Sequence, residues 1–273
     1  MDDKLLEELR KVIKGDVDDS EETLNTFSHD ASLFEVKPQV VVYPKDGQDV
    51  QNLVKFVAKH KKEYLKLSLT GRSAGTDMGG GSINESIIVA FGKYFNNTPI
   101  IKNEIATTQS GVFYRDFEKE TLKHNLIFPS YPASREICAM GGIVNNNSGG
   151  EKSLQYGKTE RYVKRIKVVL RDGNTYEIKP LTEKELKEKM ELKTLEGEVY
   201  TKMYGLISKN YEEIAKAKPN VSKNSAGYFL WNVYDKKTGI FDLTKLWVGA
   251  QGTLGLLLEA DIQLVPVHKH REM

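Results

Sequence analysis

Gly71-Arg72-Ser73-Ala74-Gly75-Thr76-Asp77-Met78-Gly79-Gly80-Gly81 is the stretch that decides the fold. Glycine adopts positive φ readily and lacks a Cβ, so a chain rich in it can approach a ligand closely. Successive backbone N–H groups in such a loop form a concavity that binds anions such as a diphosphate. Arg72 adds a positive charge to this stretch. The loop is therefore compatible with a phosphate-binding turn, and the flanking segments show which known phosphate-binding motifs it could belong to.

The segments on both sides of the loop argue against a Rossmann fold. We predict a strand over 64–69 before the loop and a β-branched strand over 87–91 after it. A Rossmann loop leads from a strand into a helix, whose N-terminus holds the phosphate. The Walker A spacing is also absent. Taken alone, the loop fits a plain structural turn as well as a phosphate cradle.

A second stretch of the same character covers residues 141–150, Gly-Gly-Ile-Val-Asn-Asn-Asn-Ser-Gly-Gly. We interpret it as a long loop, because asparagine tolerates left-handed backbone and supplies short hydrogen-bonding groups. Two such loops in one chain favour a dinucleotide cradle over two unrelated turns. A third glycine-rich segment, residues 249–255, reads as a tight turn before a core strand.

The remaining pattern mixes strand–helix alternation with hairpins, which predicts an α+β fold. A hairpin is expected over 165–179, with Asp172-Gly173 at its turn. Further strands are predicted over 40–43, 104–109 and 254–265. Helices are predicted over 2–14, 49–62, 112–124, 183–192 and 198–216.

Composition excludes several classes of function. The chain has 273 residues, 39% of them hydrophobic and 29% charged, with a formal net charge of +2. This balance gives no case for nucleic acid binding. The apolar runs are too short for a membrane helix, and the charged N-terminus lacks a signal-peptide core. We expect a cytoplasmic protein, either free or held at the inner membrane face by a partner. The single Cys138 and five scattered histidines predict no metal site.

Several motifs in order resemble those of a known family. They are GRSAGTDMGGGSI (71–83), PSYPASREICAMGGIVNNNSGGEKSLQYGKTERYV (129–163), KNSAGY (223–228) and LWVGAQGTLGLLLEADIQLVP (246–266). The chain resembles, from about residue 30 to 266, the FAD-binding domain of the vanillyl-alcohol oxidase/p-cresol methylhydroxylase (PCMH-type) flavoproteins. Within that family it is most similar to the branch of D-lactate dehydrogenases and glycolate oxidase subunits.

The resemblance implies a PCMH-type fold of two α+β subdomains with FAD held between them. Residues 1–35 would form an N-terminal helix and lead-in. Residues 36–267 would form the FAD-binding domain, with subdomains of about 36–95 and 96–267, followed by a polar tail, 268–273. We expect the substrate (cap) domain that follows in relatives to be absent.

The resemblance also assigns cofactor-binding residues. They are Arg72, Ser73, Ala74, Gly75, Thr76, Asp77, Gly79, Ser134, Gly141, Gly142, Asn146, Ser148, Gly149, Gly252 and Leu254. Thr76 stands where some relatives carry a flavin-linking histidine, and Cys138 lies near the position of a linking cysteine but not at it. We therefore expect non-covalent FAD. Gln251 replaces a glutamate that many relatives have.

The implied activity is oxidation of a 2-hydroxy acid such as D-lactate or glycolate, by hydride transfer to flavin N5 and onward transfer to an electron acceptor. A base must take the hydroxyl proton. Tyr156, Arg135 and Lys223 are candidates by motif position alone, and surface or ion-pair roles are slightly favoured for them. A second hypothesis is a flavin-binding subunit or fragment that is inactive without a separate substrate-domain partner. A non-flavin protein that retains the fold is the least favoured alternative.

Overall fold

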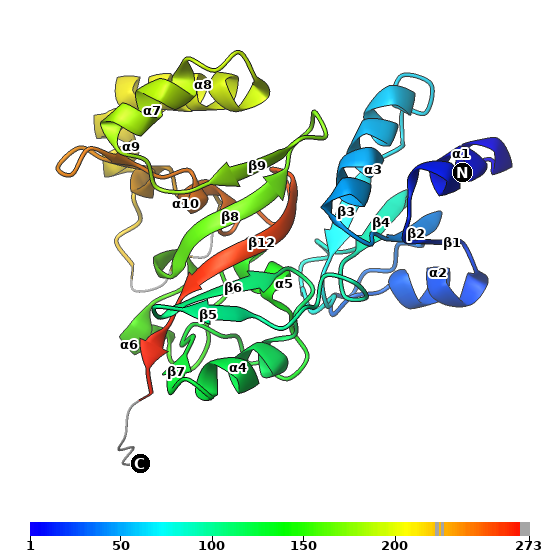
Figure 1. Ribbon diagram of the computed structural model, residues 1–273, viewed down its shortest axis with the longest axis horizontal. Coiled ribbons are helices and arrows are strands. Elements are labelled where there is room, and N and C mark those ends of the chain that lie inside the picture. The colour runs from blue at the N-terminus through cyan, green and yellow to red at the C-terminus, as the bar shows by residue number, and fades with distance from the viewer. Residues whose placement is uncertain (222–223, 225–226, 268–273) are drawn as a thin grey trace.

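Two sheets lie side by side in the computed structural model, which describes residues 1–221, 224 and 227–267 (Figure 1). The first sheet has the strand order β1-β2-β4-β3, in which β2, β4 and β3 are parallel and β1 is an antiparallel edge strand. Its strands are β1 (Asp16–Asp18), β2 (Val40–Tyr43), β3 (Leu69–Arg72) and β4 (Ile87–Ala90).

Three helices cover the first sheet because its central strands are apolar on both faces, as is typical of parallel strands. They are α1 (Asp3–Val12), α2 (Glu21–Phe27) and α3 (Gly47–His60). Leu9 of α1 and Leu53 of α3 pack in one core with Val40 of β2. Leu24 and Phe27 of α2 pack against Val41 and Ile88 in another. The lead-in segment thus supplies two helices and the edge strand β1 to this layer.

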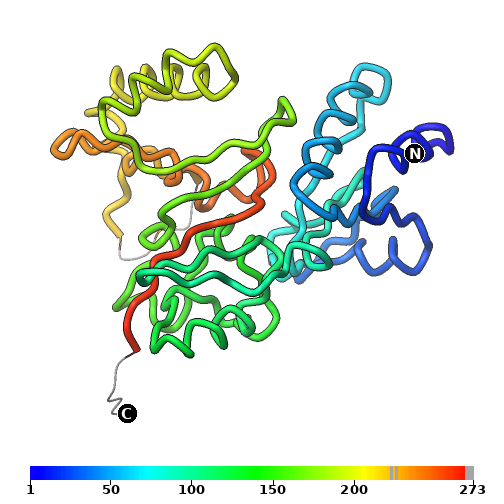
Figure 2. Tube along the Cα trace, in the orientation of Figure 1, coloured from blue at the N-terminus to red at the C-terminus, as the bar shows by residue number. Residues whose placement is uncertain are grey.

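The second sheet is antiparallel, with the order β5-β6-β12-β8-β9. Its strands are β5 (Ile100–Lys102), β6 (Ile105–Gln109), β8 (Val163–Val169), β9 (Thr175–Ile178) and β12 (Leu256–Gln263). Figure 2 shows the C-terminal strand β12 running through the middle of this sheet. Strand β12, from late in the sequence, therefore joins β6 to β8.

Helices and short strands surround the second sheet, and its largest core lies against α4 and α5. The helices are α4 (Tyr114–Leu122), α5 (Met140–Asn145), α6 (Ser153–Tyr156), α7 (Glu183–Met190), α8 (Leu195–Lys209), α9 (Tyr211–Lys216) and α10 (Thr244–Trp247), with short 3-10 turns η1 (Thr159–Arg161) and η2 (Leu230–Asn232). Two small ribbons pair β7 (Leu126–Ile127) with β13 (Val265–Pro266), and β10 (Tyr234–Asp235) with β11 (Ile240–Phe241).

The structure confirms the mixed α+β class and most of the predicted elements, with ends shifted by a few residues. The strand predicted over 64–69 is wrong, because the chain turns after α3, with Tyr64 N–H bonded to the His60 carbonyl at 2.9 Å. Only Leu69 of that range enters a strand, so Gly71 and Arg72 belong to β3 rather than to the loop. The helix predicted over 198–216 is broken at Asn210 into α8 and α9. Leu254 lies in a turn before β12, two residues ahead of the strand.

The interpretation of residues 141–150 as a loop is also wrong in its first half, which forms α5. Ile143 and Val144 are buried in the second core, and their burial supports a helix that glycine and asparagine would not favour alone. The helix ends before Asn147, whose φ is +45°. The strand β1 and helix α2 were not predicted.

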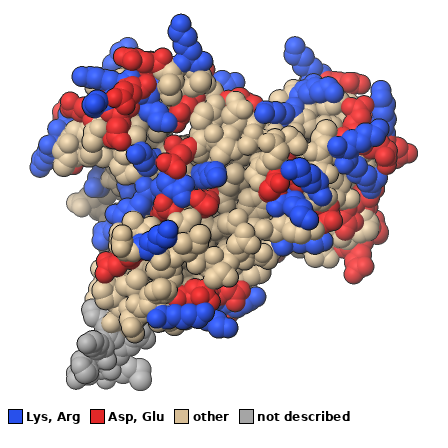
Figure 3. All heavy atoms as spheres, viewed as in Figure 1, with Lys and Arg blue, Asp and Glu red and all other residues tan. Residues whose placement is uncertain are grey.

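Acidic and basic side chains are interspersed over the face shown in Figure 3, without a large patch of one sign. Among the described residues, no helix is both long and apolar enough to cross a membrane. The described part of the chain also holds no group of three or more side chains suited to a metal ion.

Candidate functional site: a cavity between the two sheets

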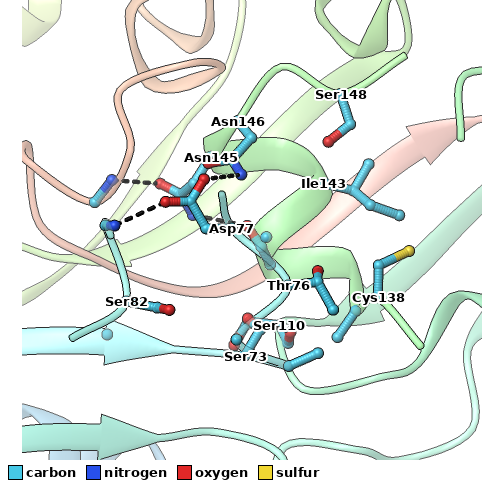
Figure 4. Close-up of a pocket in the computed structure, with 18 of the residues that line it drawn as sticks. Ser73, Thr76, Asp77, Ser82, Ser110, Cys138, Ile143, Asn145, Asn146 and Ser148 are labelled. Carbon is cyan, nitrogen blue, oxygen red and sulfur yellow. Dashed lines mark hydrogen bonds between the residues drawn. The ribbon is translucent and has the colours of Figure 1, made fainter. Parts of the chain in front are cut away.

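A cavity of about 520 Å³ lies where the loop after β3 meets α5 and the turn before β12 (Figure 4). Most of the predicted cofactor-binding residues line it. They are Ser73, Ala74, Gly75, Thr76, Asp77, Ser134, Gly141, Gly142, Asn146, Ser148 and Gly252. All three glycine-rich segments thus converge on one cavity, although they are far apart in the sequence.

Four of the predicted residues lie outside this lining. Arg72 turns toward α2, where its Nη1 donates to the Phe27 carbonyl at 3.3 Å and its guanidinium lies 4.9 Å from the Phe27 ring centroid. Burial lowers the pKa of Arg72. Gly79 donates its N–H to Asp77, Gly149 packs close to Ser153, and Leu254 packs against the second core. These four support the walls, and their contact with a cofactor stays a prediction.

The loop after β3 presents a run of unbonded amides. Residues 74–78 all line the cavity, and their backbone N–H groups donate to no group of the described residues. Gly75 has a φ of +70°, which glycine adopts at little cost, and its carbonyl accepts from the Ala31 N–H at 3.2 Å. Backbone donors without partners at a cavity wall favour an anionic ligand.

Asp77 and two asparagines of α5 connect the walls. The Asp77 carboxylate accepts from the N–H groups of Gly79 at 3.2 Å and Gly81 at 2.7 Å, and from Asn146 Nδ2 at 3.1 Å. Asn145 Oδ1 accepts from the Gly252 N–H at 3.2 Å. Figure 4 shows these side chains converging at one end of the cavity. The loop, α5 and the turn before β12 are therefore held to one another.

Two neighbouring glycines of α5 have opposite surroundings. A Cβ at Gly141 would lie 2.5 Å from Ser73 Oγ and 2.8 Å from the Ser110 carbonyl, so this glycine permits close packing of α5 on the first wall. Apart from its chain neighbours and its own helix backbone, a Cβ at Gly142 would meet no atom of the described residues within 4 Å, and a Cβ at Gly252 would meet none beyond its chain neighbours. Since both line the cavity, a bound ligand could approach their backbone closely.

Ser110 and Asn145 line the cavity but were not predicted. Ser110 Oγ is buried and has no hydrogen-bond partner in the described part of the chain, so it can bond to a ligand. Asn145 lies in the second glycine-rich stretch, in which other residues were predicted to bind the cofactor. Ser110 follows β6 in a segment without any recognisable motif. Its place in the site depends on how α5 packs, which no local pattern reveals.

Thr76 and Cys138 both line the cavity, as Figure 4 shows. Burial raises the pKa of the Cys138 thiol to about 11. At neutral pH the thiol is protonated, and a protonated thiol is a poor nucleophile. The Cys138 thiol is thus a poor nucleophile in the folded protein.

Two of the three catalytic candidates, Arg135 and Tyr156, are not among the residues that line the cavity. Arg135 forms an ion pair with Glu118, and its guanidinium lies 4.8 Å from the Tyr131 ring centroid. Tyr156, in α6, accepts at its carbonyl from the Tyr162 hydroxyl at 2.8 Å. Lys223 is outside the described residues. Their catalytic roles stay predictions.

Comparison with known proteins adds independent findings. A family model described as an FAD binding domain matches residues 38–179. The D-2-hydroxyglutarate dehydrogenase of Haemophilus influenzae is 28% identical over 252 residues, which cover 89% of this chain and 24% of that protein. The glycolate oxidase subunit GlcD of Bacillus subtilis is 27% identical over 253 residues, which cover 91% of this chain and 42% of that protein.

A solved structure of alkyldihydroxyacetonephosphate synthase superposes with a TM-score of 0.67 at 17% identity, covering 99% of this chain and 41% of that one. At this identity the match supports the fold alone. The chain spans only about a quarter to two fifths of the length of the two curated relatives described above.

Proposed function

This chain belongs to the family of FAD binding domains, and from that premise we propose that it binds FAD non-covalently in the cavity between its sheets. We further propose that the bound FAD serves the oxidation of a 2-hydroxy acid such as D-lactate or glycolate. The run of unbonded amides over 74–78 is the observation that carries the proposal. A diphosphate supplies the acceptor oxygens that these donors lack.

The other wall offers further contacts to a dinucleotide. Gly142 and Gly252 leave room beside their backbone, and Ser110 offers a hydroxyl without a partner. Asp77 takes no donor from residues 74–78, so its carboxylate shapes the loop without competing for these amides. The amides of residues 74–78 suit the charged diphosphate of FAD, and the Ser110 hydroxyl suits its uncharged polyol part.

FAD, when bound, would accept a hydride from the carbon that bears the substrate hydroxyl. The residues of this chain would hold the cofactor without forming a covalent bond to the flavin. Thr76 offers a hydroxyl of low nucleophilicity, and Cys138 holds its proton at neutral pH. We therefore expect that acid denaturation releases all of the flavin.

Support for the hydroxy-acid reaction comes from the relatives, one named a D-2-hydroxyglutarate dehydrogenase and another a glycolate oxidase subunit. Both are much longer than the matched segment. The alternative is therefore a flavin-binding subunit or fragment that turns over only beside a separate substrate-domain partner. An electron-acceptor protein would be the other partner.

An absorbance spectrum before and after acid precipitation tests the cofactor proposal. Flavin bands near about 370 and 450 nm, with all colour in the supernatant afterwards, are the expected signature of the cofactor. Titration of the colourless form with FAD and FMN sharpens the test, since FMN lacks the diphosphate. FAD should bind far more tightly, and equal binding would contradict the role of residues 74–78. Dye reduction with D-lactate or glycolate, with and without candidate partners, separates the two functional alternatives.

A further inference from the structure

A second cavity, of about 770 Å³, is lined by residues that do not line the proposed cofactor cavity. It is bounded by α6, η1, η2, α10 and residues that follow α9. Gly150 lines it, two residues after Ser148 of the first cavity. The chain between the two cavities is held from both sides, since the Gly150 N–H donates to Ser153 Oγ at 2.7 Å and the Ser148 carbonyl accepts from Thr159 Oγ1 at 2.8 Å. The second cavity is therefore a distinct candidate site.

Its described lining holds more basic than acidic side chains. The basic residues are Lys158, Arg161, Lys218 and Lys245, and the acidic ones are Glu151 and Glu160. Two of the lysines are bonded to the backbone, because Lys158 Nζ donates to the Asn224 carbonyl at 3.1 Å and Lys245 Nζ donates to the Glu160 carbonyl at 2.6 Å. The excess of positive charge favours an anionic ligand.

Arg161 and Lys218 have no carboxylate within 4.0 Å in the described part of the chain. They come from different walls, since Arg161 ends η1 and Lys218 follows α9. Gly157 has a φ of +77°, and a Cβ there would lie 2.4 Å from Arg161 Nε, so the absence of a side chain lets Arg161 pack against this backbone. A phosphate monoester carries nearly two negative charges and several acceptor oxygens, which suits two such cations.

An aromatic pair forms the apolar part of the lining. Trp231 and Phe229 both line the cavity, and their ring centroids lie 5.2 Å apart at an interplanar angle of 30°. Phe229 is buried and Trp231 is half-buried, so Phe229 supports the more exposed indole. Nucleobases stack on aromatic side chains of this kind, and a base with a phosphate would use both the aromatic and the basic part of the lining.

Glu160 adds a requirement for a hydrogen-bond donor. It lines the cavity, and its Oε2 is buried without a partner in the described part of the chain. A buried acceptor without a donor is costly, so a base that presents N–H groups is favoured at this carboxylate. Guanine presents two neighbouring N–H donors on its pairing edge. Adenine, the base of FAD, presents one amine beside an acceptor nitrogen and matches a carboxylate less well.

We propose that this cavity binds a guanine mononucleotide such as GMP. Its base would stack on Trp231 and donate to Glu160, and its phosphate would be held by Arg161 and Lys218. The site goes beyond the proposed function, because none of these residues lines the cofactor cavity and no contact to FAD is required.

Trp231 provides a built-in reporter, because the chain has two tryptophans and the other, Trp247, is buried. We would titrate the purified protein with GMP, with IMP, which lacks the exocyclic amine, and with guanosine, which lacks the phosphate. GMP should bind about tenfold more tightly than either, as expected for the loss of one charge-assisted contact. In Trp231→Phe the fluorescence response should disappear, while calorimetry should still detect GMP binding, since phenylalanine retains a stacking surface.

Variants test the two cations. Arg161→Gln and Lys218→Gln should each weaken GMP about tenfold and leave guanosine unchanged, because guanosine has no phosphate to lose. Lys209→Gln is the matched control, since Lys209 is an exposed lysine at the end of α8 that does not line the cavity. Equal binding of guanosine and GMP, or no effect of either variant, would overturn the proposal.

Glu160→Gln tests the recognition of the base. The amide cannot accept both guanine N–H groups, so the preference for GMP over IMP should disappear while the preference for GMP over guanosine remains. Inorganic phosphate that binds as tightly as GMP would reduce the cavity to a general anion site and contradict the nucleotide assignment.

Saturating FAD keeps this proposal separable from that for the cofactor. GMP affinity should be the same with and without FAD, and Arg161→Gln should leave FAD affinity unchanged. Competition between FAD and GMP would place GMP in the first cavity and refute the second site. GMP binding in a protein that does not bind FAD would refute the cofactor proposal and leave the guanine site standing.

Discussion

Asn146 Nδ2 donates a hydrogen bond to Asp77 Oδ1 at 3.1 Å, and this bond joins the loop of the first sheet to helix α5 beside the second. The other carboxylate oxygen of Asp77 accepts the N–H groups of Gly79 and Gly81. One side chain therefore fixes the shape of the loop and its place against the facing wall. A ligand that spans the two walls gains from this preorganisation.

Asp77→Ala should weaken FAD binding about tenfold, because the loss of hydrogen bonds to a carboxylate frees the loop to adopt other shapes. Asn146→Ala should weaken binding by a smaller factor. The double variant should bind scarcely more weakly than Asp77→Ala, since both changes remove the same bond. Flavin fluorescence titration measures all three, with the exposed Asp116→Ala as control. Additive losses would show that the two side chains act independently.

Gly141→Ala and Gly142→Ala should separate stability from cofactor binding. An added methyl at Gly141 meets Ser73 and Ser110. The melting temperature of the Gly141→Ala protein should therefore fall by several degrees, as is typical of overpacking that costs about 1–3 kcal/mol. At Gly142 the methyl meets no described atom within 4 Å beyond its chain neighbours and its own helix backbone, so the melting temperature without FAD should be unchanged or slightly higher. FAD affinity should nevertheless fall. Unchanged FAD affinity in Gly142→Ala would place the cofactor elsewhere.

Much of the fold could be predicted from the sequence, because the residues that are buried follow the apolar pattern typical of their strand or helix. Val40, Val41 and Val42 are fully buried, and such an apolar run is what a covered parallel strand requires. The hairpin turn at Gly173, with a φ of +71°, matches its Asp-Gly signature. The glycine-rich loop also predicted where the cavity lies, because its glycines reflect a local backbone requirement that the sequence shows directly.

The missed features depend on tertiary packing. Helix α5 holds two glycines and an asparagine, which have low helix propensity, yet it forms because Ile143 and Val144 are buried. Strand β1 is short and only partly buried, and it exists because β2 offers an edge to pair with. Ser110 enters the site only through the packing of Gly141. No window of sequence contains these relationships.

The thiol of Cys138 should be unreactive in the folded protein. Burial raises its pKa to about 11, so at pH 8 it carries a proton and is a poor nucleophile. A raised pKa for an acidic group means that folding disfavours its ionised form, so this group costs stability only as the pH rises above the unfolded value near 9. A disulfide reagent should react in urea much faster than in buffer at pH 8. Rapid reaction of the native protein would contradict the burial.

Asp49 makes the N-terminal segment part of the first layer. Its carboxylate is fully buried and accepts backbone N–H groups from Lys14, Gly15 and Lys45, each at 2.9 Å. It therefore joins the end of α1 to the segment between β2 and α3. Gly15 fits closely there, since a Cβ would lie 2.0 Å from the Tyr43 carbonyl.

Asp49→Ala should lower the free energy of unfolding by about 3 kcal/mol, because three backbone donors lose their acceptor. The neighbouring Asp46→Ala, which removes the N-cap of α3, should cost only about 1 kcal/mol. Urea unfolding followed by far-UV circular dichroism measures both. Because Asp49 ties α1 to the sheet, we expect a single transition in each variant, and a first transition confined to the N-terminal helix would show that this segment folds separately. Equal costs for the two variants would mean that water replaces the Asp49 carboxylate without penalty.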